Sequence, residues 1–272
     1  SWRIQRKQFV QNDVATIVSP GQQGEGENKI KDLTCHACMT DAGYQVVSVS
    51  FPDIYECKYC KHIFRRYDGN VSEFHRDEYR SLILPDGNLG YDFKPVEDRT
   101  KHVNSILGKI SSFLKSSDKC LEVGFGDGVF TKLLSPHVKK VECCEIDPNL
   151  ALQAEQQGFH AYCKNVLDLN GAEYDSVFAF DIMEHVLDIQ QFKDKMTELT
   201  NSTLVIQVPV NRRLKPPNRP QGFDGHCHYF SADSIKRVFE KDFDLKLLYT
   251  SEPNEFANGC EMLTVWEKIK CI

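Results

Sequence analysis

The sequence KCLEVGFGDGVFTKLL, Lys119–Leu134, carries the strongest structural signal in this chain. A short apolar run precedes glycines at alternate positions, Gly124, Gly126 and Gly128, and a helical pattern follows them. This order predicts a strand, a tight turn and a helix, because glycine adopts left-handed angles and lets a ligand approach the backbone closely. The spacing is G-x-G-x-G, whereas the dinucleotide fingerprint is G-x-G-x-x-G, so the turn alone leaves the cofactor open.

Helical and strand patterns alternate from about residue 99 to the end of the chain. Apolar spacing predicts helices at residues 99–114, 148–158, 189–199 and 231–242. Strands are predicted at residues 120–124, 138–145, 159–163, 174–180, 202–210, 243–250 and 261–269. The repeated units indicate an α/β fold with a doubly wound, Rossmann-like parallel sheet, its last two strands forming a hairpin-like pair. In such sheets ligands bind beyond the carboxyl ends of the strands.

The composition is that of a globular chain with room for one large core and a small second module. The 272 residues carry a net charge of −6, which argues against nucleic acid as a general partner. No apolar run approaches the ~20 residues of a membrane span, and the first residues lack a secretory signal, so we expect a cytoplasmic protein without membrane insertion. Because the chain starts at Ser1 rather than Met, we expect a trimmed chain or part of a longer polypeptide.

Four cysteines near the start form two C-x-x-C pairs. Cys35 and Cys38 belong to CHAC, Cys57 and Cys60 to CKYC, and 18 residues separate the pairs. This spacing predicts a tetrathiolate zinc site, which is structural because four thiolates close the coordination shell. Two disulfides are the alternative, which a cytosolic compartment disfavours.

The residues around the glycine turn distinguish between adenine-bearing cofactors. Glu145 ends the second predicted strand, 21 residues after Gly124, where a carboxylate accepts hydrogen bonds from a ribose diol. Glu122 would repel a pyrophosphate, but it could organise the turn or approach a positively charged amino-acid group. Asn165 and the amide of Val166 follow the third strand and are available to an adenine edge. Together these features favour S-adenosylmethionine over a nicotinamide cofactor.

At this point the chain resembles a known family. LEVGFGDG, CCEIDP, NVLDL, YDSVFAFDIMEHVLD and VIQVPV, in this order, resemble the motifs of class I S-adenosylmethionine-dependent methyltransferases. The resemblance covers residues 99–272 and implies their fold, cofactor and activity. The residues that it and the spacing assign to the cofactor are Glu122, Gly124, Phe125, Gly126, Gly128, Glu145, Ile146, Asn165, Val166, Asp181 and, as a lid, Tyr91.

The upstream region narrows the resemblance. The paired C-x-x-C turns followed by DEYR and NLGYDF look like sugar and glycan methyltransferases, including deoxysugar C-methyltransferases with an amino-terminal zinc motif. In these, a histidine before an aromatic-Phe-Ser segment lies near the substrate, and GHCHYFS places His226 there. Gly225 replaces the acidic residue that often precedes it, and the chain ends where the C-methyltransferases continue. Both departures favour methylation of oxygen over carbon.

Histidines supply the candidate general bases, because a neutral imidazole can accept the proton of a hydroxyl. We choose His226, with a structural or substrate-orienting role as the alternative, and include His185 as a second catalytic candidate. His228 shares the face of His226 if the segment is extended, which would place it at the substrate, and with His185 it could also form a metal site. Asp181 and His185 have the spacing i, i+4, for which helix capping is the alternative.

A basic loop follows the fifth predicted strand on the substrate side. NRRLKPPNRP, residues 211–220, contains Arg212 and Arg213, and arginines bind phosphate or carboxylate in a bidentate manner. This predicts an anionic acceptor such as a nucleotide-linked or phosphorylated sugar. A solvated basic loop is the alternative.

The sequence therefore predicts an arm and linker (residues 1–30), a zinc-binding module (31–67), a connecting segment or lid (68–98) and a methyltransferase domain (99–272). The leading function is S-adenosylmethionine-dependent methylation of a hydroxyl oxygen on a sugar, nucleotide-sugar or other small glycan-type acceptor. One alternative is a nucleic-acid or protein methyltransferase that uses the zinc module as a reader. The other is a scaffold that has lost turnover.

Overall fold

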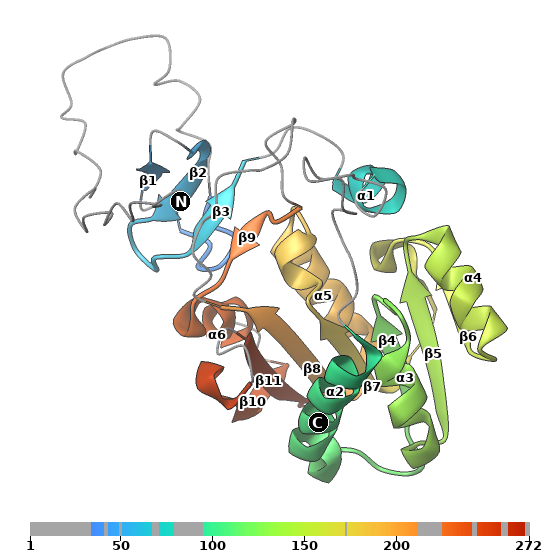
Figure 1. Ribbon diagram of the computed structural model, residues 1–272. Helices are drawn as coiled ribbons and strands as arrows, with labels where there is room; N and C mark the ends of the chain where they lie inside the picture. Colours follow the sequence, from blue (N-terminus) through green and yellow to red (C-terminus); the bar gives the residue numbers. More distant parts are fainter. Residues whose placement is uncertain are drawn as a thin grey trace, which may run out of the picture.

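The computed structural model describes residues 34–40, 43–48, 51–66, 71–78, 95–171, 173–210, 225–240, 244–256 and 261–269. Within these ranges the chain forms a seven-stranded sheet with helices on both faces and a separate four-stranded sheet (Figure 1). Of the described helices, none is both long and apolar enough to cross a membrane.

The large sheet has the strand order β10-β11-β8-β7-β4-β5-β6. Its strands are β4 (Lys119–Val123), β5 (Lys140–Glu145), β6 (His160–Cys163), β7 (Tyr174–Phe180), β8 (Thr200–Pro209), β10 (Leu245–Thr250) and β11 (Glu261–Lys268). Strands β4 to β8 run parallel, whereas β11 is antiparallel to β8 and β10 is antiparallel to β11. The predicted α/β sheet and its final hairpin-like pair are therefore confirmed.

Helices cover both faces of this sheet. They are α2 (Val96–Ile110), α3 (Val129–Leu134), α4 (Pro148–Gln156), α5 (Ile189–Leu199) and α6 (Ala232–Glu240). Shorter 3₁₀ turns occupy Ser111–Phe113, Ser135–His137, Val166–Asp168, Met183–His185 and Pro253–Glu255. Buried residues of α2 and α3 pack with Phe178 and Leu263 on one face. Those of α5 and α6 pack with Val177 and Trp266 on the other face.

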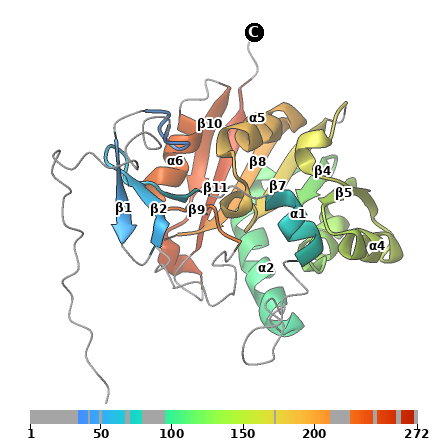
Figure 2. The ribbon, with the colours of Figure 1, turned by 90° about the horizontal axis from the view of Figure 1, so that it is seen from above.

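The four-stranded sheet combines two distant parts of the chain. It has the order β1-β2-β3-β9, with β1 at Tyr44–Ser48, β2 at Phe51–Cys57, β3 at Ile63–Arg65 and β9 at His228–Tyr229. Strand β9 pairs antiparallel with β3, placing His228 opposite Phe64. Figure 2 shows this sheet beside α6, at the opposite end of the molecule from α4. The predicted zinc-binding module is thus completed by a strand from the predicted methyltransferase domain.

A short helical segment lies between β3 and α2 in the sequence. It consists of α1 (Val71–Glu73) and a π-helical turn at Phe74–Glu78. Its inner side chains, Val71 and Phe74, are buried. The segment precedes α2, which begins three residues before the predicted start of the large domain. Its position brings Ser72 and His75 to the large cavity.

Candidate functional site

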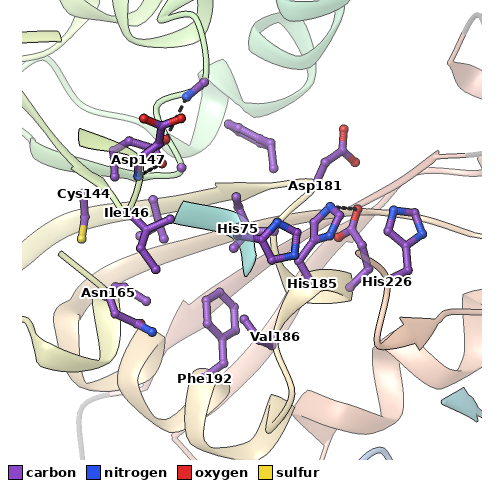
Figure 3. Close-up of a pocket in the computed structure, with 18 of the residues that line it drawn as sticks. His75, Cys144, Ile146, Asp147, Asn165, Asp181, His185, Val186, Phe192 and His226 are labelled. Atoms are coloured by element: carbon purple, nitrogen blue, oxygen red, sulfur yellow. Dashed lines mark hydrogen bonds and ion pairs between the residues drawn. The ribbon is translucent and has the colours of Figure 1, made fainter. Parts of the chain in front are cut away.

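A cavity of about 1380 Å³ lies over the carboxyl ends of the parallel strands. Figure 3 shows Asn165 and Ile146 toward one end, and His75, His185 and His226 in a row toward the other. The residues assigned to the cofactor from sequence that line this cavity are Gly124, Gly126, Glu145, Ile146, Asn165, Val166 and Asp181. Tyr91, Arg212 and Arg213 lie outside the described residues, so their roles stay predictions.

The glycine turn is built from left-handed backbone angles. Gly124, Gly126 and Gly128 have φ values of +80°, +57° and +78°. A Cβ at Gly128 would lie 2.2 Å from the ring of Phe125, which is itself 2% exposed. Phe125 and Gly128 therefore shape the turn from beneath and do not line the cavity. Gly124 and Gly126 form part of the wall.

Glu145 is positioned by the backbone around it. Its Oε2 accepts the N–H of Gly126 at 3.3 Å, and its Oε1 accepts the N–H of Asp147 at 2.9 Å. Asp147 caps α4 through the N–H of Asn149, which fixes the strand-to-helix turn. Glu145 lines the cavity, so these two hydrogen bonds fix its carboxylate at the cavity wall.

Glu122 does not line the cavity. It is 4% exposed and accepts a hydrogen bond from the Thr131 hydroxyl of α3. Burial, together with the nearby charge of Glu145, raises the pKa of Glu122 to about 8, although the hydrogen bond from Thr131 opposes the shift. Of its two predicted roles, the structure supports organising the turn, because the side chain joins β4 to α3.

Asn165 links the cavity wall to the segment over it. Its Oδ1 accepts the N–H of Leu167 at 3.0 Å, which caps the 3₁₀ turn beginning at Val166. Its Nδ2 donates to Ser72 Oγ at 3.0 Å. Sequence reasoning missed Ser72, because no local pattern indicates which upstream residue meets Asn165.

Three histidines meet at the other end of the cavity. The ring centroid of His185 lies 4.6 Å from that of His75 and 4.7 Å from that of His226. His185 Nδ1 lies 2.8 Å from the carbonyl oxygen of Gly225, and His75 Nε2 lies 3.2 Å from the same oxygen. Gly225 has φ +91°, a left-handed conformation that favours glycine. The structure thus brings the two predicted catalytic histidines together and adds His75, which the sequence did not indicate.

Two acidic residues precede His185. Glu184 is 2% exposed, and its Oε1 lies 3.8 Å from His185 Nε2. Asp181 has φ +52°, which is uncommon for a residue other than glycine and often marks a functional turn. Both line the cavity at the end of β7. Glu184 was not predicted as a site residue, although it belongs to the quoted stretch YDSVFAFDIMEHVLD.

His228 is a correction to the sequence analysis. It is 2% exposed, with Nδ1 3.0 Å from His62 Nε2 and Nε2 3.2 Å from the Leu187 carbonyl oxygen. Burial lowers the pKa of His228 to about 3, assisted by the nearby His36 ring. The expectation that it shares the face of His226 fails, because β9 begins only at His228 and the preceding residues are not in regular strand geometry. It therefore joins neither the substrate cavity nor His185.

The four predicted zinc ligands form a compact, buried group. The Sγ atoms of Cys35 and Cys60 are 3.5 Å apart, those of Cys38 and Cys57 are 3.7 Å apart, and all four lie within 4.8 Å of one another. A tetrahedron with zinc–sulfur bonds of 2.3 Å has edges of about 3.8 Å, whereas a disulfide bond is about 2.05 Å. The hydrogen bond between the thiols of Cys35 and Cys60 lowers the pKa of Cys60 and raises that of Cys35. The geometry therefore fits a tetrathiolate metal site, and these cysteines are not in disulfides.

Comparisons with known proteins agree with the fold of the large domain. A family model described as a methyltransferase domain matches residues 96–250. The fold is similar to that of the N-methyltransferase NodS from Bradyrhizobium japonicum WM9 in complex with S-adenosyl-L-homocysteine, with a TM-score of 0.53, 19% identity and coverage of 74% of this chain and 100% of that one. It is also similar to magnesium protoporphyrin IX methyltransferase from Synechocystis PCC 6803 with bound S-adenosylmethionine, with a TM-score of 0.55, 13% identity and coverage of 75% and 100%.

Proposed function

The chain belongs to the methyltransferase-domain family whose model matches residues 96–250, and from this membership we propose that it transfers a methyl group from S-adenosylmethionine to a hydroxyl oxygen. The proposed acceptor is a sugar, nucleotide-sugar or other small glycan-type molecule. The observation that carries the proposal is a single cavity that joins the glycine turn and Glu145 to His185 and His226. The solved structures with related folds hold this cofactor or its demethylated product.

The cofactor end has a suitable group for each part of the proposed ligand. Gly124 and Gly126 allow the methionine portion to approach the backbone, and Glu145 accepts hydrogen bonds from the ribose hydroxyls. Asn165 and Val166 contribute polar groups at the adenine end. When bound, the cofactor supplies an activated methyl group, so the protein mainly needs to orient the acceptor and remove its proton.

The histidine end would perform the proton transfer. We assign His226 as the base that takes the acceptor's hydroxyl proton, with His185 beside it. His185 Nδ1 bonds the Gly225 carbonyl, an acceptor only, so Nδ1 carries the proton and Nε2 is the proton-accepting nitrogen. This orientation supports a role for His185 in holding the acceptor hydroxyl beside His226.

The cysteine group would hold a structural zinc ion. Cys35, Cys38, Cys57 and Cys60 match its preferred ligands and geometry, and all four are buried. The ion would join the two C-x-x-C turns of a segment with a small apolar core of its own. Its effect on the reaction would be indirect, through the four-stranded sheet that contains β9.

The test uses the purified full chain. Calorimetry should detect S-adenosyl-L-homocysteine binding, and a panel of sugar nucleotides with S-adenosylmethionine should yield a product heavier by one methylene unit. His226→Ala should keep that affinity while turnover falls by about 10²- to 10⁴-fold. His160→Asn, at an exposed histidine outside the cavity, is the matched control. Binding of NADH in place of S-adenosyl-L-homocysteine would refute the cofactor, and full turnover by His226→Ala would refute the base.

A further inference from the structure

Glu184, His185 and His226 each offer a potential metal-ligand atom at the histidine end of the cavity. The three atoms lie within 4.8 Å of one another. We propose that these residues bind one divalent transition-metal ion, separate from the cysteine site, and that this ion binds the acceptor through two neighbouring oxygens. The ion site stands on its own geometry, whereas the role of the acceptor rests on the proposed function.

The donor set indicates the kind of ion. Two imidazoles and one carboxylate suit manganese, iron, cobalt or zinc, and the same set holds iron(II) in oxygenases with open coordination positions. Magnesium and calcium prefer oxygen ligands throughout. The cysteine group offers only soft thiolates and therefore selects a different ion chemistry. The two sites can be filled and tested separately.

The hydrogen bonds around His185 orient it as a ligand. Because Nδ1 donates to the Gly225 carbonyl at 2.8 Å, the lone pair is on Nε2, which lies 3.8 Å from Glu184 Oε1. Two ligands bound to one ion at about 2.1 Å are separated by about 3.0 to 3.4 Å, so a small inward movement completes the pair. Metal-bound histidines commonly donate their other ring N–H to a carbonyl or carboxylate, as His185 does.

The same carbonyl group positions the third ligand. His75 also bonds the Gly225 oxygen, and Gly225 immediately precedes His226. Gly225 has a left-handed φ of +91°, and its carbonyl oxygen is shared by His75 and His185. His75 is therefore a positioning residue, because its Nε2 is engaged with this carbonyl.

The remaining coordination positions face the acceptor. All three ligands line the cavity that also contains Glu145 and Asn165. An acceptor with a vicinal diol, as in many sugars, could occupy two adjacent positions on the ion. An ion held there would lower the pKa of a bound hydroxyl, and the proton of that hydroxyl would pass to water. In the ion-loaded protein this replaces proton transfer to His226, which acts instead as a ligand.

Manganese binding to zinc-loaded protein tests the proposal. The cysteine site is first filled with one equivalent of zinc, and Mn²⁺ is then titrated while electron paramagnetic resonance measures the free ion. We expect one Mn²⁺ per chain, and Glu184→Gln and His226→Ala should each raise its Kd by at least about tenfold. His160→Asn, which alters the exposed His160–Glu155 pair, should leave the Kd unchanged. A sugar nucleotide with a vicinal diol should change the bound Mn²⁺ spectrum, and its deoxy analogue should not.

Two results would overturn the ion site. One is that the zinc-loaded protein binds neither Mn²⁺ nor Co²⁺, and the other is that Glu184→Gln and His226→Ala bind Mn²⁺ as tightly as the wild type. Retained S-adenosyl-L-homocysteine binding by each variant shows that it is folded. If Mn²⁺ binds but S-adenosyl-L-homocysteine does not, the proposed function fails while the ion site stands. An identical spectrum with the diol and its deoxy analogue would refute the role of the acceptor.

Discussion

Replacing Glu145 with glutamine should weaken cofactor binding by a calculable amount. The carboxylate already accepts the N–H groups of Gly126 and Asp147, at 3.3 and 2.9 Å, and it lines the cavity. Glutamine has one acceptor oxygen, so it cannot serve both backbone groups and a ribose diol. Loss of a hydrogen bond to a charged group costs about 1.5 to 3 kcal/mol, which corresponds to an increase of about 10- to 150-fold in Kd.

Titration calorimetry with S-adenosyl-L-homocysteine measures this change directly. Glu155→Gln is the matched control, because Glu155 also accepts a backbone N–H, from Ala161 at 2.7 Å, but does not line the cavity. The control should bind with wild-type affinity. Far-ultraviolet circular dichroism establishes that both variants are folded. Wild-type affinity in Glu145→Gln would show that the ribose lies elsewhere and would refute the assignment of this end of the cavity.

Other parts of the structure give further predictions. Gly128→Ala should lower the free energy of unfolding by about 1–2 kcal/mol because of its left-handed φ, and the clash with the Phe125 ring should add a further steric cost. Gly158→Ala is the control, because Gly158 also has a left-handed φ, of +87°, but open space around it. Urea titrations of the two variants therefore separate the backbone cost from the steric cost. Glu122 has a raised pKa of about 8, so the folded state holds its proton more tightly than the unfolded state. The contribution of protonated Glu122 to the free energy of unfolding is therefore greatest below about pH 4.5 and is lost as the pH rises toward 8, by at most about 1.4 kcal/mol per pH unit. Glu122→Gln should remove this component of the pH dependence. Zinc analysis should find about one ion per chain, and Cys57→Ser should release it and lower the melting temperature, whereas retention of zinc would contradict the tetrathiolate site.

The large sheet could be predicted from sequence because its signals are local. Apolar spacing predicts a helix over residues 189–199, and α5 occupies those residues. The run at 174–180 predicts a buried strand, and β7 has the same bounds. Each element has a buried face long enough to give a clear period, and turns between elements contain glycine or a helix cap. The cofactor end follows, because strand ends at one edge of a parallel sheet bring their loops together.

The histidine end could be predicted only in part, because it depends on contacts between distant segments. His185 and His226 could be selected by residue type, but nothing local places His75 beside them. The sequence could not predict which way the His228 side chain points either, because that depends on the pairing of β9 with Phe64 of β3. A two-residue strand has too little pattern to reveal its pairing, and the backbone just before it sets which face each histidine occupies.

Gly225 shows why the difference from the sugar methyltransferases cannot be interpreted from residue type alone. The resemblance leads us to expect an acidic side chain before His226, and the glycine in its place favours methylation of oxygen over carbon. In the structure, however, the left-handed backbone of Gly225 presents its carbonyl oxygen to both His75 and His185. A residue with a Cβ would be strained at that φ. The hydrogen-bond acceptor that Gly225 supplies to the two histidines is therefore its backbone carbonyl.

The position of Gly225 also connects the two sheets. From Gly225 the chain passes through His226 and then enters β9, whose partner β3 follows the second cysteine pair by a few residues. The N–H of Arg65 in β3 donates to the Cys227 carbonyl at 2.7 Å, so this pairing continues up to the residue after His226. Disturbing the cysteine group should therefore affect the histidine end before the cofactor end, because Glu145 and the glycine turn are held by the large sheet. The four-stranded sheet thus reaches the histidine end of the cavity through the backbone pairing of β3 with His228 and Cys227, directly after His226.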